Sequence, residues 1–192
     1  MTGPADMTAL AWLAALDLAA FHAVNVDAGP FLDRAASLLS EPAFGILWGL
    51  ALAFALAVRL GRGALPGIGS LAAGAGLADF LGDRLLRPAF GRVRPCYALP
   101  PGSFRGLLHA ANAGSLPSLH AANLFALATA ATLADRRLGL AAYPVAVAVA
   151  WSRVYGGVHW PGDVVAGALW GSLAAALVWA AAGRLARRGA RA

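Results

Sequence analysis

The chain has 192 residues, of which 60% are hydrophobic and 12% charged, and its mean hydropathy is +0.68. A soluble domain carries about twice that charged fraction, so the composition argues against a soluble protein and for a membrane-embedded one. All 15 basic residues are arginine and the net charge is +6, but the arginines flank apolar runs and line no single polar face, which argues against a nucleic-acid interface. The single cysteine, Cys96, excludes an intrachain disulfide.

The first apolar segment covers residues 7–24. No basic stretch precedes it, so we expect a retained transmembrane helix and not a cleaved signal. Residues 30–40 have apolar side chains on one side and Asp33 and Arg34 on the other, which predicts a short amphipathic helix along the membrane interface. A second transmembrane helix is predicted at 42–60.

Further apolar segments fill the rest of the chain. A third span is predicted at 68–86, where Pro88 disfavours helix at Arg87. A loop of about 27 residues then covers 88–114 and is rich in Pro, Gly and Arg; a loop that long is typically functional or disordered. The remaining spans are predicted at 116–134, 138–154 and 161–183, the fourth opening at Ser115 or Leu116 with Pro117 in its first turn.

These segments predict an all-α fold, an integral membrane bundle of six transmembrane helices with one short interfacial amphipathic helix. The length suits a single domain covering residues 1–192. Its motif-bearing core is expected at about 68–183, followed by a basic cytoplasmic tail at 184–192.

The placement of arginine predicts the topology. Six crossings put 8 arginines on one side and 7 on the other, which alone decides nothing. If Arg87, Arg94 and Arg153 have a chemical role, the count becomes 8 against 4. The positive-inside tendency then places both termini in the cytoplasm and the loop at 88–114 on the opposite face.

The first of three arginine-centred clusters is Arg87 followed by Arg94 and Pro95. Arginine binds phosphate through a planar, bidentate fork. Taken singly, an arginine at the end of an apolar helix is equally typical of ordinary snorkelling to the interface. Asp83 lies one helical turn before Arg87, where we expect a plain ion pair.

The second cluster is the tetrapeptide from Pro117 to His120. The backbone N–H groups of Ser118 and Leu119 at a helix N-terminus can bind an anion, and Ser118 adds a hydroxyl. His120 could protonate a leaving oxygen. On its own this pattern is weak, because a single histidine near an interface is more often structural.

The third cluster, Ser152, Arg153, His159 and Asp163, is the most specific. Arg153 ends one predicted span and His159 precedes the next. Asp163 can reach back to one nitrogen of His159, which would fix the tautomer and leave the other nitrogen free as a nucleophile. Taken alone, the pair also fits an interfacial histidine beside a helix-capping aspartate.

In this order and on one membrane face, the three clusters resemble the type 2 phosphatidic acid phosphatase superfamily, which includes bacterial membrane lipid phosphatases and is related to vanadium haloperoxidases. The family pattern is Lys-x6-Arg-Pro, Pro-Ser-Gly-His and Ser-Arg-x5-His-x3-Asp. Arg87 stands where the family has lysine, and Leu119 where it has glycine.

The resemblance implies that His159 attacks phosphorus and forms a phosphohistidine, that Asp163 orients His159, and that His120 serves as acid and then as base. It implies phosphate contacts from Arg87, Arg94, Ser118, Leu119 and Arg153. No metal or cofactor is expected, because the sequence has no acidic cluster suited to Mg²⁺ and no Cys/His zinc spacing.

The expected substrate is a lipid phosphate in the bilayer, with undecaprenyl diphosphate as the first choice. Phosphatidylglycerophosphate, phosphatidic acid and a lipid A phosphate remain alternatives. The implied location is the bacterial inner membrane with the site facing the periplasm. Arg105, His109 and Asn112 in the long loop could read a head group, and the sequence says nothing about oligomeric state.

Two other functions stay open. A phosphotransferase would pass the phosphoryl group from His159 to a second lipid in place of water. A non-catalytic channel or transporter would use the arginines to line an anion path. A pore has no need of Asp163 behind His159, so the sequence favours an enzyme.

Overall fold

The computed structural model describes residues 9–189, and every regular element within them is a helix. Residues 7 and 8 of the first predicted span and the end of the predicted tail lie outside the described residues. The main helices are α1 (Ala9–Val24), α2 (Pro30–Ser40), α3 (Pro42–Leu60), α4 (Leu65–Leu81), α5 (Arg87–Phe90), α6 (Pro95–Ala98), α7 (Leu119–Ala134), α8 (Arg136–Tyr155) and α9 (Pro161–Gly189).

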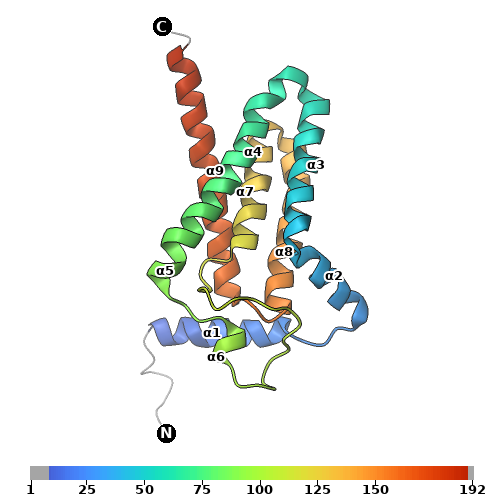
Figure 1. Ribbon diagram of the computed structural model, residues 1–192, viewed down its shortest axis with the longest axis vertical. Coiled ribbons are helices and arrows are strands. Elements are labelled where there is room, and N and C mark those ends of the chain that lie inside the picture. Colours follow the sequence, from blue (N-terminus) through green and yellow to red (C-terminus); the bar gives the residue numbers. More distant parts are fainter. Residues whose placement is uncertain (1–8, 190–192) are drawn as a thin grey trace.

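The long helices α3, α4, α7, α8 and α9 run along one axis and form a bundle (Figure 1). α7 is the central helix and packs against the other four. Within the described part, three segments are long and apolar enough to cross a membrane, namely Pro42–Ala98, Arg136–Tyr155 and Pro161–Arg188. The first of these contains both α3 and α4, and α7 is a shorter apolar helix.

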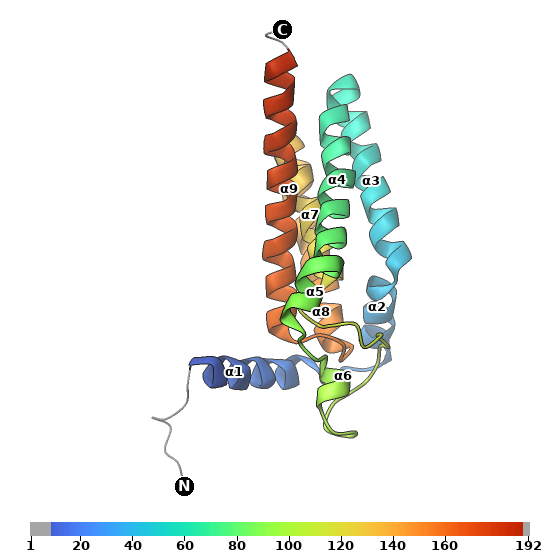
Figure 2. The ribbon, with the colours of Figure 1, turned by 60° about the vertical axis from the view of Figure 1, so that its left-hand side comes forward.

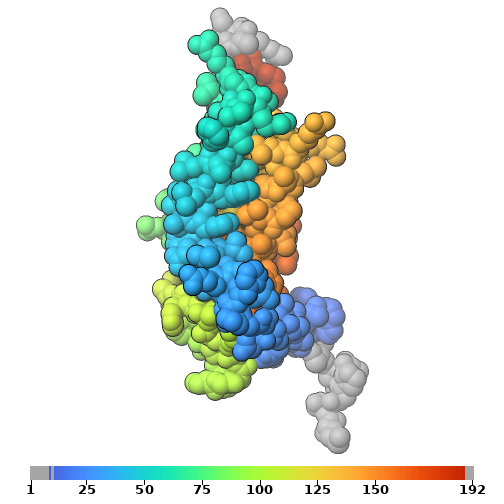
Figure 3. Space-filling view, turned by 90° about the vertical axis from the view of Figure 1, so that its right-hand side faces the viewer, coloured from blue at the N-terminus to red at the C-terminus, as the bar shows by residue number. Residues whose placement is uncertain are grey.

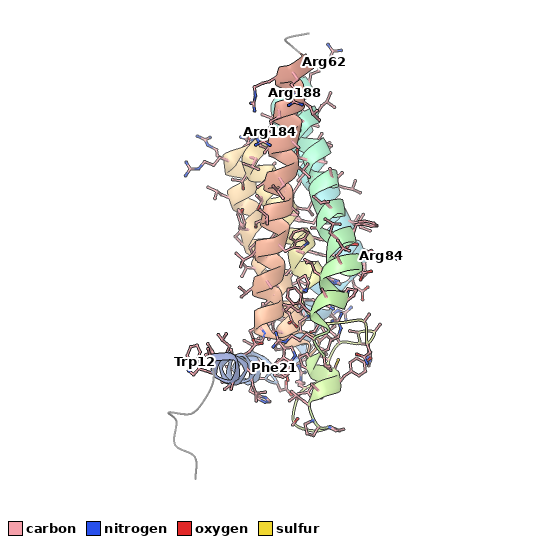
Figure 4. The ribbon with its side chains drawn as sticks, turned by 90° about the vertical axis from the view of Figure 1, so that its left-hand side faces the viewer. Trp12, Phe21, Arg62, Arg84, Arg184 and Arg188 are labelled. Atoms are coloured by element: carbon pink, nitrogen blue, oxygen red, sulfur yellow. The ribbon has the colours of Figure 1, made fainter. Side chains whose placement is uncertain are left out.

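α1 differs from the prediction, because it does not stand beside the other helices. It lies across the end of the bundle and not alongside α9 (Figures 1 and 2). Its one central charge, Asp17, is paired with Arg92, and Phe21 is buried against Trp160 with ring centroids 5.3 Å apart. Trp12 points away from the bundle (Figure 4). The sequence predicted α1 as the first of six transmembrane crossings. In the arrangement of the described helices, this first crossing is not present.

Small residues let the helices approach closely around α7. A Cβ added at Gly171 of α9 would lie 1.9 Å from the carbonyl oxygen of Ala122 in α7. A Cβ added at Gly74 of α4 would lie 3.1 Å from the Cα atom of Ala175 in α9. Close backbone packing of this kind holds apolar helices together where the surroundings are equally apolar.

The third predicted span was wrong at its end, because the helix continues past Pro88. A π-helical turn at Gly82–Leu86 separates α4 from α5. The wider turn shifts the hydrogen-bond register just before Pro88, whose missing N–H then falls near the start of a new helical segment. Gly91 ends α5 in the left-handed conformation, with φ 56°.

The start of the fourth predicted span was also wrong. α7 begins at Leu119, with Ser118 as its N-cap, and Pro117 precedes the helix. The long loop between Gly91 and Ser118 contains the short helix α6.

The predicted interfacial helix at 30–40 coincides with α2, which packs against α8. Ser40 at its end shares a hydrogen bond of 2.9 Å with Ser152 of α8. Figure 3 shows α2 and α3 beside α8 on this face, with the long loop at the same end as α2. Arg62, Arg184 and Arg188 gather at the other end of the bundle, far from α1 (Figure 4).

Candidate active site

The three sequence clusters meet at one cavity of about 890 Å³. The chain reaches it from separate places: the start of α5, the loop before α6, the first turn of α7, the end of α8 and the turn before α9. The charged and titratable side chains from the clusters that line this cavity are Arg87, Arg94, His120, Arg153 and His159.

His159 is 1% exposed and has a defined tautomer. Its Nε2 atom lies 2.8 Å from Nη1 of Arg94, which can only donate, so Nε2 is the acceptor. The proton is therefore on Nδ1, which lies 3.2 Å from Oδ2 of Asp163. Burial lowers the pKa of His159 to about 3, against the opposing effect of Asp163, so the imidazole is neutral at physiological pH. A neutral ring with its Nε2 lone pair toward the cavity is the form that a nucleophile needs.

Asp163 is fully buried and hydrogen-bonded at both oxygens. Oδ2 accepts from Ser115 and from the backbone N–H of Trp160, the latter at 2.9 Å, in addition to its contact with His159. Oδ1 accepts from Arg92 at 2.8 Å. These bonds hold the carboxylate in one position behind the imidazole.

Two of the guanidinium groups are buried with unused donors. Arg94 is 5% exposed and Arg153 is 6% exposed. Within residues 9–189 the Nε atoms of both, and the hydroxyl of the fully buried Ser118, have no hydrogen-bond partner. Buried donors of this kind carry a desolvation cost unless a ligand binds them, and an oxyanion is the ligand that guanidinium groups suit best.

Arg87 lies at the edge of the cavity. Its Nη1 donates to Asp83 at 3.2 Å, the ion pair expected from their spacing, although the Asp83 side chain is 48% exposed. Its Nε donates to the carbonyl oxygen of Pro117 at 3.4 Å. Arg87 is thus tied to the segment just before α7.

His120 is held by α2. Its Nε2 lies 3.0 Å from the carbonyl oxygen of Ser40, and a carbonyl only accepts, so Nε2 carries a proton. Arg153 reaches the same carbonyl at 3.5 Å. The expectation that the Ser118 N–H can bind an anion was wrong, because this group donates to the backbone oxygen of Asp163 at 3.0 Å. The N–H of Leu119 lies in the first turn of α7, where a helix supplies no acceptor.

Leu119, in place of the family glycine, packs toward α4. A Cβ added at Gly82 would lie 2.5 Å from Cδ2 of Leu119, so Gly82 provides the space for this side chain. Leu119 also contributes to the cavity wall. Leu119 therefore adds apolar surface beside the charged groups.

Beyond the charged groups, along the length of the bundle, the cavity continues as an apolar groove between α3 and α4. Its walls include Gly45, Gly49 and Ala53 of α3 and Ala72 and Gly76 of α4. One polar pair interrupts this surface: Asn123 of α7 donates to Asp79 of α4 at 2.9 Å, and its own side-chain oxygen is buried without a partner in the described part of the chain.

Sequence reasoning missed Ser40, Ser115 and Arg92, which support His120 and Asp163 through contacts between distant residues. Arg105, which the sequence suggested could read a head group, is not among the residues that line this cavity; it pairs with Asp33 and contacts the hydroxyl of Tyr155. His109 does line the cavity.

Two solved structures share the fold. LpxE of Aquifex aeolicus aligns over 92% of this chain and 98% of its own, with a TM-score of 0.69 and 22% identity. The first transmembrane PAP2 type phosphatidylglycerolphosphate phosphatase from Bacillus subtilis aligns over 94% of this chain and 90% of its own, with a TM-score of 0.66 and 22% identity. At such identities the likeness concerns the fold alone.

Two curated relatives are more similar in sequence. A lipid A 4'-phosphatase of Bacteroides thetaiotaomicron is 35% identical over 118 residues, covering 58% of this chain and 52% of that protein. The putative undecaprenyl-diphosphatase YbjG of Escherichia coli is 44% identical over 81 residues, 40% of each chain. The matches thus span about half the length of these relatives or less.

A family model described as the PAP2 superfamily matches residues 67–187, the stretch that carries all three clusters. That match covers well over half of the sequence, and the chain belongs to the PAP2 superfamily.

Proposed function

We propose that this protein is an integral membrane phosphatase that removes the terminal phosphate of a lipid phosphate through a phosphohistidine at His159. One observation carries the proposal. The Nε2 lone pair of His159 faces a buried guanidinium, Asp163 holds the opposite nitrogen, and the cavity in front continues into an apolar groove. A phosphate with a lipid attached satisfies both parts of this cavity.

In the first step the phosphate oxygens bind the guanidinium groups of Arg94, Arg153 and Arg87, with further contacts from the Ser118 hydroxyl and the Leu119 N–H. The phosphate replaces Nε2 of His159 as the acceptor for Arg94, which frees the lone pair for attack. The Nε2–P bond forms in line as the bond from phosphorus to the lipid oxygen breaks. Fixed positive charge around the oxygens is the main aid to such a transfer.

His120 supplies the proton for the departing oxygen. Since Nε2 of His120 is held by the Ser40 carbonyl, the mobile proton is on Nδ1 of its imidazolium, which the negative charge of the bound phosphate favours. In the second step water attacks the phosphohistidine, His120 takes the proton of that water, and inorganic phosphate leaves. Asp163 stabilises the positive charge that His159 gains while it carries the phosphoryl group.

No metal enters this proposal. The arginines provide the charge that a bound cation provides in other phosphoryl-transfer enzymes. Among residues 9–189, no three His, Cys, Asp or Glu side chains are grouped in a way that could hold a metal ion.

For the substrate we propose undecaprenyl diphosphate first, a choice that the similarity to YbjG supports. A second candidate is favoured by Asp79 and Asn123. The leaving oxygen, which carries the lipid, lies next to His120. From there the lipid extends into the groove past Asn123, which lies one helical turn further along α7. A glycerol or sugar there would offer donors to the Asp79 carboxylate and to the unpartnered oxygen of Asn123, which suits phosphatidylglycerophosphate or a lipid A phosphate.

We propose that the site faces the periplasm and that the C-terminal end of α9 is cytoplasmic. The arginine-rich end of the bundle, with Arg62, Arg184 and Arg188, then lies on the inner side, as the positive-inside tendency requires (Figure 4). α1 lies across the site end and does not cross the bilayer in this arrangement. The proposal therefore drops the cytoplasmic N-terminus that six crossings implied.

Replacing His159 by alanine is expected to lower phosphate release roughly a thousandfold or more, because the nucleophile is removed. The measurement is phosphate release from lipid phosphates by the purified protein in detergent. His22→Ala, at an exposed position on α1, is the matched control and should keep full activity. Turnover by His159→Ala above that of a mock preparation would contradict the assignment.

Exhaustive treatment with EDTA should leave the rate of phosphate release unchanged, since the positive charge comes from arginine side chains. The rate is measured before chelation, after it, and after re-addition of Mg²⁺, Mn²⁺ or Zn²⁺. Loss of activity that one of these ions restores would show that a metal is required.

The substrate is tested with a panel of undecaprenyl diphosphate, phosphatidylglycerophosphate, phosphatidic acid and a lipid A phosphate. If undecaprenyl diphosphate is preferred, Asp79→Asn should raise its kcat/KM, because the remaining phosphate of the lipid lies near that carboxylate and is repelled by it. If the second candidate is right, the wild type prefers a glycerol or sugar phosphate, and Asp79→Asn lowers kcat/KM for it about tenfold.

The native Cys96, partly exposed in α6 at the site end, reports the orientation. A membrane-impermeant maleimide should label it in cells whose outer membrane is permeabilised but whose inner membrane is intact. In a Cys96→Ala background, Arg62→Cys at the opposite end should be labelled after lysis alone. The reverse pattern would place the site in the cytoplasm.

A further inference from the structure

Arg92, which is not one of the family's motif residues, lies between two carboxylates. Its Nη1 donates to Oδ1 of Asp163 at 2.8 Å, and its Nη2 donates to Oδ2 of Asp17 on α1. The Asp163 side chain is 0% exposed and the Asp17 side chain 13% exposed. The series from His159 through Asp163 and Arg92 to Asp17 therefore links the catalytic imidazole to a helix that lies across the end of the bundle (Figure 2).

The position of Arg92 is fixed from several directions. Its guanidinium carbon lies 5.5 Å from the centre of the Trp160 ring, and its backbone oxygen accepts from the N–H of Ser115 at 2.8 Å. Asp17 makes a second contact, accepting from the backbone N–H of Gly162 at 2.7 Å. Gly162 directly precedes Asp163, so Asp17 holds the carboxylate both through Arg92 and through the backbone.

Charge distinguishes this arrangement from a simple tie between α1 and the bundle. Arg92 alone would neutralise Asp163 and weaken the support that its carboxylate gives to a positively charged His159. Asp17 compensates the guanidinium, so the three groups together keep one net negative charge behind the imidazole. The Arg92 side chain is 29% exposed and that of Asp17 13% exposed, so water screens these charges in part, while the fully buried Asp163 acts on the reacting ring with little screening.

We propose that Asp17 and Arg92 are positioning residues for the reaction, which hold Asp163 in place and keep a net negative charge behind His159 as it accepts the phosphoryl group. The inference rests on the proposed phosphohistidine mechanism. It gives α1 a role in the reaction: the seating of this apolar helix on the outer end of the bundle brings Asp17 to Arg92. Phe21, which is on the same helix as Asp17, is buried against Trp160 and keeps α1 in this position.

The test uses Asp17→Asn, Arg92→Gln and the double variant, each measured for kcat, KM and pH profile in detergent. Asp17→Asn keeps the shape and an acceptor for Gly162 but removes the compensating charge and the oxygen that accepts from Arg92, so kcat should fall about tenfold with KM unchanged. The acid limb of its pH profile should move to lower pH, because His159, facing Asp163, Arg94 and Arg153, becomes less basic. Arg92→Gln should move that limb to higher pH.

The double variant distinguishes the proposed effect of the Asp17 and Arg92 charges from a role of the pair that is limited to attaching α1 to the bundle. Removing both charges restores the single negative charge of Asp163, so the double variant should be faster than Asp17→Asn. If the pair only fastens α1, the double variant is as slow as Asp17→Asn or slower. Asp27→Asn, at an exposed carboxylate 3.7 Å from Arg105, is the matched control and should behave as wild type.

A wild-type kcat for Asp17→Asn, or a double variant no faster than Asp17→Asn, would overturn the inference. Thermal unfolding of each variant in the same detergent identifies a variant that does not fold, and the comparison then rests on Arg92→Gln and its predicted shift to higher pH. An inactive wild type, or a fully active His159→Ala, would instead refute the proposed function itself, so the two failures are distinguishable.

Discussion

The burial of positive charge around His159 is the constraint on which the rest of the site depends. Arg94 and Arg153 are taken out of water almost completely, and their Nε atoms have no partner within the described residues. A buried and incompletely paired cation is unfavourable by itself, and an oxyanion removes that cost. Burial, together with the smaller effect of the nearby Arg94 and Arg153 charges, lowers the pKa of His159 and keeps its imidazole neutral. In the proposed mechanism Asp163 contributes most when that ring carries a phosphoryl group.

The bundle makes this arrangement possible by holding backbones close together. Gly171 lets α9 lie against α7, and this contact sets the start of α9, with Asp163, beside the start of α7, with Ser118. α2 reaches the same place from the side and gives its last carbonyl, that of Ser40, to His120 and Arg153. The site is thus assembled from helix ends at one end of the bundle, while α3 and α4 leave a groove open along its side.

Local sequence signals predicted the features that depend on residues close together in the chain, such as helix starts and contacts one helical turn apart. Pro30 and Pro42 mark the first residues of α2 and α3, and the spacing of His159 and Asp163 predicted their contact. Hydropathy detected the apolar run of α1 but not its direction, because that depends on where Asp17 finds Arg92, 75 residues away in sequence. The roles of Arg92 and Ser115 were equally out of reach, since their contacts with Asp163 join residues 71 and 48 positions apart.

The most direct test of this account is to measure, by titration calorimetry, the binding of orthovanadate to the purified protein. Orthovanadate is an analogue of the phosphoryl group in the transition state of its transfer. The account predicts one site per chain that competes with inorganic phosphate and is weakened at least about tenfold by Arg153→Gln, because a charge-assisted bond is lost. Binding of the same strength in Arg153→Gln, or no saturable binding to the wild type, would contradict a buried arginine cluster built around one anion.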